Sequence, residues 1–266
     1  MNRAPIGIFD SGIGGLTVAR AIYDRLPHES TIYFGDTARV PYGPKSPDTV
    51  KRYSLEILQW LLDQGVKAIV VACNTSTAHA LRTLQEASAV PVLGVIKPGA
   101  RAAIGTGGGG PIGVIGTVGT IASDAYKRAI QALAPGVPVV QRACPLFVPL
   151  VEEGWFDHPA TELVAADYLR ELRESCVRSL VLGCTHYPLL KPLLQRIMGP
   201  EVSLIDSGQA TAVALETILA DKALEAPAEA KPSHRFVVSD DEARFRQVGS
   251  RFIGERLGKA EVVPLG

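Results

Sequence analysis

Two of the four cysteines, Cys73 and Cys184, each follow an apolar run that is typical of a buried strand. Ligands bind at the carboxyl ends of the strands in open α/β sheets, so both thiols are expected where a site forms. A thiolate can accept a proton and a thiol can return one, which predicts acid–base chemistry for the pair. The polar residues that directly follow the two cysteines are Asn74, Thr75, Thr185 and His186.

These neighbours are expected to begin a helix after each cysteine. A helix N-terminus holds anions and lowers the pKa of a thiol from about 8.5. Even without that help, forming a thiolate at pH 7 costs only about 2 kcal/mol, so no metal is needed. A cysteine at a strand end is more often a buried small hydrophobe, but two such cysteines at corresponding places favour function. Cys144 and Cys176 have no polar flanks and are interpreted as structural.

A glycine-rich turn, Asp10–Thr17, follows the first apolar strand. An alternative function for this turn is dinucleotide binding, but its glycines are spaced G-x-G-G and not G-x-G-x-x-G as in that motif. We therefore interpret Asp10 and Ser11 as polar groups of the site, with helix capping as the alternative for Asp10.

Two further groups are candidates on weaker signals. Tyr42 and Gly43 offer a hydroxyl and an accessible backbone N–H, although the pattern alone favours a plain Pro/Gly turn. His186 lies beside Cys184 and is a candidate proton partner. Glu152 or Glu153 could accept a hydrogen bond from it, with an exposed helical glutamate as the alternative.

Strand-like and helical patterns alternate along the chain, which predicts an α/β fold with mostly parallel sheets flanked by helices. Ser46 and Pro47 indicate the N-cap and first residue of a helix that ends before Gly65. The expected strands are Ile6–Phe9, Thr31–Phe34, Ala68–Ala72, Val92–Val95, Ile112–Ile115, Val137–Gln141, Ser179–Leu182, Val202–Ile205 and Arg235–Val238.

The two halves of the chain repeat the same order of features. Pro5–Ile8 resembles Pro111–Val114, and each leads through a glycine-containing turn to a later strand that ends in a cysteine. We therefore expect two related α/β lobes. The run Gly105–Gly110, which includes Gly107–Gly110, is expected to be a surface loop near a domain boundary, and Pro227–Pro232 a second surface connection.

Composition narrows the possible functions. The 266 residues are 47% hydrophobic and carry 27 basic and 27 acidic side chains, so a nucleic-acid partner is not expected. No apolar run approaches the roughly 18 residues of a membrane span, and no secretory signal precedes the first strand. A cytoplasmic location is therefore expected. The cysteine spacing matches no zinc site, and the thiols are expected to be free.

Five motifs together resemble those of glutamate racemases, in the aspartate/glutamate racemase family, in an order that extends from residue 5 to about residue 215. The segment 114–120, which contains Thr117, also looks like a family segment. The five motifs are Ile8–Val18, Tyr33–Gly43, Ala72–Thr75, Leu182–Leu189 and Ile205–Gly208.

The resemblance implies a cofactor-independent enzyme that supplies D-glutamate for peptidoglycan. It implies two pseudo-symmetric lobes with the site between them, formed by residues 1–96 with 208–266 and by residues 97–207. A homodimer is also expected from the family.

The resemblance further implies a role for each site residue. Cys73, assisted by Asp10, would act on D-glutamate, and Cys184, assisted by Glu152 and His186, would act on L-glutamate. An aspartate racemase is the nearest alternative, and a nucleotide-binding or thiol redox module is the alternative from other classes. The implied substrate contacts are Asp10, Ser11, Tyr42, Gly43, Asn74, Thr75, Thr117, Thr185 and His186.

Overall fold

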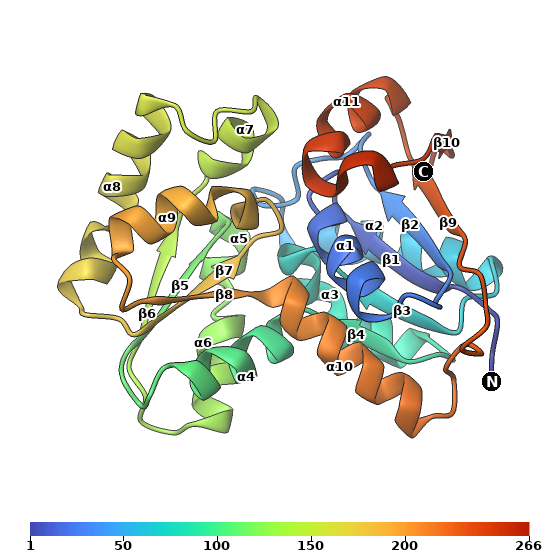
Figure 1. Ribbon diagram of the computed structural model, residues 1–266, viewed down its shortest axis with the longest axis horizontal. Helices are drawn as coiled ribbons and strands as arrows, with labels where there is room; N and C mark the ends of the chain where they lie inside the picture. The colour runs from blue at the N-terminus through green and yellow to red at the C-terminus, as the bar shows by residue number, and fades with distance from the viewer. Residues whose placement is uncertain (266) are drawn as a thin grey trace.

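A computed structural model describes residues 1–265 as two lobes, each built on a parallel sheet (Figure 1). The strands of the larger lobe are β1 (Ile6–Asp10), β2 (Thr31–Gly35), β3 (Ala68–Val71), β4 (Val92–Gly94), β9 (His234–Val238) and β10 (Ala260–Val262). The strands of the smaller lobe are β5 (Ile112–Gly116), β6 (Val139–Ala143), β7 (Ser179–Gly183) and β8 (Ser203–Asp206).

The same strand order occurs in both sheets. The larger sheet has the order β10-β9-β2-β1-β3-β4 and the smaller has β6-β5-β7-β8, so β2-β1-β3-β4 corresponds to β6-β5-β7-β8. All strand pairs in both sheets are parallel. The expected α/β fold with two pseudo-symmetric lobes is confirmed. All nine expected strands are present, and β10, a three-residue edge strand, is the one that the sequence pattern missed.

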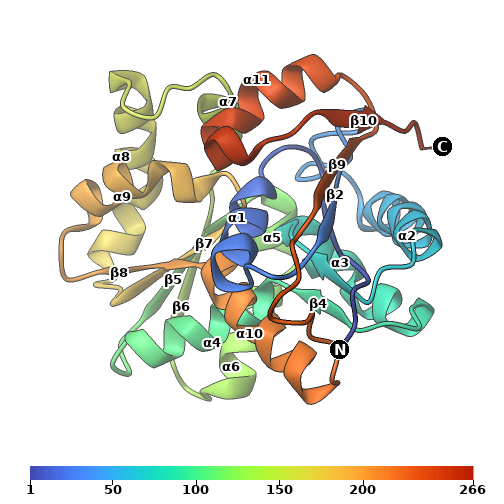
Figure 2. The ribbon, with the colours of Figure 1, turned by 45° about the vertical axis from the view of Figure 1, so that its right-hand side comes forward.

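Helices flank both sheets, as Figure 2 shows from a second side. The helices beside the larger sheet are α1 (Leu16–Arg25), α2 (Pro47–Asp63), α3 (Asn74–Ala87), α10 (Ser207–Asp221) and α11 (Glu242–Ile253). The helices of the smaller lobe are α4 (Ile96–Thr106), α5 (Val118–Ala122), α6 (Ala125–Leu133), α7 (Phe147–Glu152), α8 (Pro159–Glu174) and α9 (Lys191–Met198). Two 3-10 turns complete the set, η1 (Tyr187–Leu190) and η2 (Gly254–Arg256). As predicted, Ser46 caps α2: its Oγ accepts a hydrogen bond from the Thr49 N–H at 3.3 Å.

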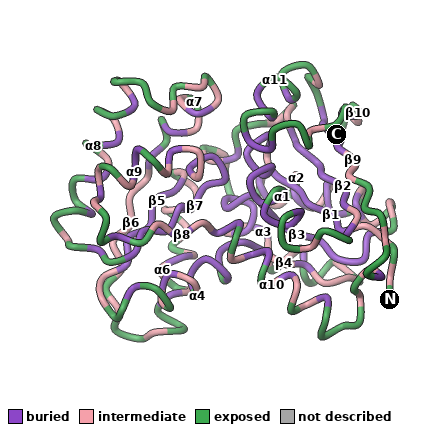
Figure 3. The backbone as a smooth tube through the Cα atoms, viewed as in Figure 1, coloured by how far each residue is buried: buried purple, intermediate pink, exposed green. Residues whose placement is uncertain are grey.

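The central strands are buried on both faces, which explains their continuous apolar runs (Figure 3). In β1, Ile6 and Ile8 pack into one apolar cluster and Phe9 into the cluster on the other face. In β5, Ile112 packs into one cluster and Ile115 into another. Each sheet is therefore held between two apolar layers, and its strand ends are fixed in position.

The glycine run is a surface loop, as expected, except that Gly105 and Thr106 still belong to α4. Gly107–Gly110 joins α4 to β5 inside the smaller lobe, whereas the chain enters that lobe between β4 and α4. The reason is that α4 packs with Ile96, Ala100 and Ala103 against the smaller sheet. Because β5–β8 form one sheet and the other strands form the second, we propose the lobe division 1–96 with 208–266 and 97–207. Among residues 1–265, no helix is long and apolar enough to cross a membrane.

Candidate active site

A small cavity of about 30 Å³ lies where the carboxyl ends of the central strands of the two lobes meet. Ser11 follows β1, Cys73 follows β3, Thr117 follows β5 and Cys184 follows β7. Its lining residues are Ser11, Val40, Pro41, Tyr42, Gly43, Cys73, Asn74, Thr75, Thr117, Val148, Cys184, Thr185 and His186. The two cysteines therefore share one cavity.

Ten of the twelve predicted site residues line this cavity, and the other two lie next to it. Asp10 is buried at the end of β1, where its Oδ2 accepts the Gly12 N–H at 3.0 Å. Glu152 ends α7 and lines the neighbouring apolar groove. The pattern missed the apolar lining residues Val40, Pro41 and Val148, because isolated apolar residues carry no signal for a site.

Cys73 is itself the N-cap of α3, and its sulfur accepts the Ser76 N–H at 3.4 Å. Burial raises the pKa of Cys73 to about 11, the charge of Asp10 adds to the rise, and hydrogen bonds from Ser76 oppose it. The prediction of a lowered pKa is therefore wrong for this cysteine. The helix N-terminus is present, but desolvation and a neighbouring carboxylate outweigh it.

Cys184 belongs to a chain of three side chains in the smaller lobe. Its Sγ lies 3.9 Å from Nδ1 of His186, whose Nε2 lies 3.0 Å from Oε1 of Glu152. Thr185 and His186 lie in a turn before η1, so the α-helix expected to begin here is absent from this segment. Of the two candidate glutamates, Glu152 is the one in contact with His186.

The charges along this chain reinforce one another. Burial alone would lower the pKa of His186, but hydrogen bonds with Cys184 and Glu152 outweigh it and raise the pKa to about 10. Burial also opposes ionisation of Glu152, but His186 and Arg244 outweigh it and lower the pKa of the carboxyl. At neutral pH, an imidazolium therefore lies between a carboxylate and the sulfur of Cys184.

Polar contacts across the lobes surround the Cys73 side of the cavity. The Tyr126 hydroxyl in α6 donates to Oδ1 of Asn74 at 2.7 Å. Thr75 Oγ1 lies 2.9 Å from that of Thr117 and 3.3 Å from that of Thr120. Tyr126 and Thr120 were not among the predicted residues, because nothing in their local sequence distinguishes them from ordinary helix residues.

A buried carboxylate holds the Tyr42 loop in place. Asp36 accepts hydrogen bonds from the Tyr42 hydroxyl, from Arg39 Nε at 2.7 Å and from Ser239 Oγ at 2.8 Å. Asp36 lies in the Tyr33–Gly43 motif, but its local sequence carries no signal for this role. Its partner Ser239 comes from the end of β9, about two hundred residues later in the chain.

Two buried polar atoms at the site have no hydrogen-bond partner within residues 1–265, Oδ1 of Asp10 and Nδ2 of Asn74. One is an acceptor and the other a donor, so they suit the ammonium and a carboxylate of an amino acid. Among the same residues, no cluster of three or more His, Cys, Asp or Glu side chains is arranged as metal ligands would be.

Comparison with known proteins assigns the chain to a family. The family described as Asp/Glu/Hydantoin racemase matches residues 16–215. A glutamate racemase of Geobacter metallireducens is 55% identical over 260 residues, which cover 98% of this chain and 96% of the relative.

Solved structures agree with this assignment. The glutamate racemase RacE1 of Bacillus anthracis is 41% identical with a TM-score of 0.95, covering 99% of this chain and 98% of that one. The Francisella tularensis glutamate racemase in complex with D-glutamate is 39% identical with a TM-score of 0.92, with the same coverage. The chain therefore belongs to the Asp/Glu/Hydantoin racemase family, and the three relatives compared above are glutamate racemases.

Proposed function

We propose that the protein interconverts L-glutamate and D-glutamate by moving a proton between Cα and the thiols of Cys73 and Cys184. The observation that carries the proposal is that these two cysteines, from corresponding strands of two lobes, line one cavity. Inversion requires removal of the proton from one face of Cα and delivery to the other. Two thiols on facing walls can do this, whereas a single base would return the proton to the face that it left.

The buried polar groups indicate how the substrate is held. Oδ1 of Asp10 is free to accept from the α-ammonium, and Nδ2 of Asn74 is free to donate to a carboxylate. The hydroxyls of Ser11, Thr117 and Thr185 line the same cavity and can donate as well. This set of one anion and several donors suits a zwitterionic amino acid with a second carboxylate.

The cavity is too small for that substrate as the lobes now lie. About 30 Å³ holds one or two water molecules, whereas glutamate has ten non-hydrogen atoms. We infer that the lobes separate to admit glutamate and then close again. Closure would exclude water and aim the donors at the carbanion-like transition state, which supplies most of the catalysis.

The surroundings of the two thiols differ, and each suits one direction of the racemisation. A pKa of about 11 keeps Cys73 protonated, and forming its thiolate at pH 7 costs about 5 kcal/mol. The imidazolium of His186 faces the sulfur of Cys184 and stabilises negative charge there. This arrangement suits removal of a proton from L-glutamate by Cys184, with Cys73 returning one on the opposite face. For D-glutamate the roles reverse, and the substrate ammonium beside Asp10 would offset the charge that disfavours the Cys73 thiolate.

Racemisation in D₂O with EDTA present tests the proposal. Purified enzyme should abolish the circular dichroism of L-glutamate and incorporate deuterium at Cα, whereas aspartate incubated in parallel should react far more slowly. Cys73→Ser and Cys184→Ser should each reduce racemisation by at least about a thousandfold, because an alcohol is a far weaker acid than a thiol. Full activity in either variant would refute the two-thiol mechanism, and faster reaction of aspartate would favour that substrate.

Nucleotide binding at the Asp10–Thr17 turn finds no support in the packing. A Cβ on Gly14 would lie 2.4 Å from Nδ1 of His186 and from Oγ1 of Thr185, so the other lobe already occupies the space beside the turn. A homodimer and a cytoplasmic location remain part of the proposal. Light scattering during gel filtration tests the dimer.

A further inference from the structure

Helix α11 belongs to the larger lobe and reaches the side chains of His186 and Glu152 in the smaller lobe. Figure 1 shows α11 and α7 on the same side of the molecule, one on each lobe. Phe245 and Phe252 bury one face of α11 in an apolar cluster to which both lobes contribute. The ring of Phe252 also lies edge-on to the ring of His186, with centroids 5.5 Å apart.

Two arginines of α11 contact the same residue of the smaller lobe. Nη2 of Arg244 lies 3.3 Å from Oε2 of Glu152, and Nη1 of Arg251 donates to the backbone oxygen of Glu152 at 2.6 Å. The other oxygen of Glu152, Oε1, faces Nε2 of His186 at 3.0 Å. The Glu152 carboxylate therefore connects His186 to a helix of the opposite lobe.

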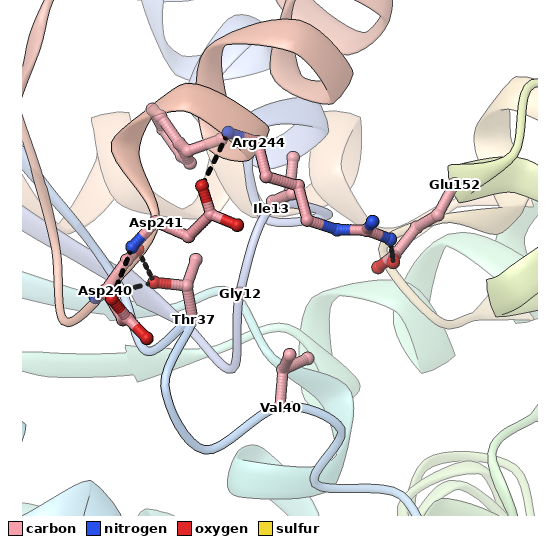
Figure 4. A pocket seen from close by; sticks show the side chains of 9 residues that line it. Gly12, Ile13, Thr37, Val40, Glu152, Asp240, Asp241 and Arg244 are labelled. Carbon is pink, nitrogen blue, oxygen red and sulfur yellow. Dashed lines mark hydrogen bonds and ion pairs between the residues drawn. The ribbon is translucent and has the colours of Figure 1, made fainter.

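Figure 4 shows how the Arg244 side chain reaches this carboxylate. It extends from the first turn of α11 past Ile13 toward Glu152, which projects from the other lobe. The start of the helix is fixed by Asp241, whose Oδ1 accepts the Arg244 N–H at 2.9 Å. A pocket lies beside this contact between the lobes. Four charged side chains line it, Glu152, Asp240, Asp241 and Arg244.

We propose that Arg244 is a positioning residue that holds the Glu152 carboxylate against His186 only when the lobes are closed. The inference rests on the proposed racemisation and goes beyond it, because it assigns a function to a contact between lobes. When the lobes separate for substrate entry, α11 and α7 move apart and the contact breaks. Glu152 is then free to leave His186, and the imidazolium loses the carboxylate that orients its ring toward Cys184. Closure restores the contacts from Glu152 through His186 to Cys184 at the moment when the substrate is enclosed.

Removal of the Arg244 charge tests the proposal. Arg244→Met should lower kcat/KM roughly fivefold, the upper end for a partly exposed ion pair. Arg244→Lys, which keeps a cation at this position, should recover at least half of the loss. Arg246→Met is the matched control on the same helix, because the one ion pair of Arg246 within residues 1–265 is with Glu242, at 3.9 Å. This control should behave as wild type.

Deuterium isotope effects separate positioning from a general loss of structure. If the step at Cys184 becomes slower, the isotope effect on kcat/KM should rise for L-[2-²H]glutamate and fall for D-[2-²H]glutamate. In a Glu152→Gln background, Arg244→Met should have little further effect, since both substitutions act on one contact. An equal change of the isotope effects in both directions, wild-type kinetics of Arg244→Met, or additive losses in the double variant would overturn the proposal. A wild-type enzyme without racemase activity would refute the proposed function instead.

Discussion

The ionised state of His186 has a measurable consequence for stability. The pKa of His186 is about 10 in the folded protein and about 6.5 for a free histidine. Because the folded pKa is raised, the stabilisation is fully present below pH 6.5 and is lost as the pH rises through 10. Each pKa unit corresponds to about 1.36 kcal/mol, so the contribution is at most about 5 kcal/mol.

The comparison of wild type with His186→Gln isolates this contribution. The free energy of unfolding is measured by urea denaturation, followed by far-UV circular dichroism, at several values between pH 6.5 and 10. The difference between wild type and variant should shrink by about 1.4 kcal/mol for each pH unit in this range. Glu152→Gln removes one of the two groups that raise the pKa, so its loss of stability should begin at the same pH and end at a lower one. A difference between wild type and His186→Gln that stays constant across the range would refute an imidazolium in the folded enzyme.

Two further substitutions test the packing of the site. Tyr126→Phe keeps the buried ring but removes the donor to Asn74 Oδ1, so we expect KM for glutamate to rise about five- to tenfold with a smaller change in kcat. Unchanged KM in steady-state assays would show that Tyr126 does not orient the Asn74 amide. Gly14→Ala places a methyl group 2.4 Å from Nδ1 of His186 and should lower kcat about a hundredfold or more, with circular dichroism showing that the fold is retained. Near-wild-type turnover would mean that the turn can move away from His186 without cost.

The sequence alone determined nine of the ten strands, the two-lobe organisation and most of the cavity lining. A buried parallel strand is a local apolar run, and a polar residue directly after it lies at the carboxyl edge whatever the rest of the chain does. For this reason Cys73, Cys184 and their polar neighbours could be identified without coordinates. The cap at Ser46 was predictable on the same grounds, because it depends on residues within one turn of helix.

Tertiary structure decided which groups support those residues and with what charge. Tyr126 and Asn74 are 52 residues apart in the chain, and Arg244 and Glu152 are 92 apart, so no local pattern links them. The raised pKa of Cys73 has the same origin, because it depends on burial and on Asp10 from a different strand. A strand and the polar residues that follow it depend on neighbouring residues in the sequence. Desolvation and contacts between lobes exist only once the chain has folded.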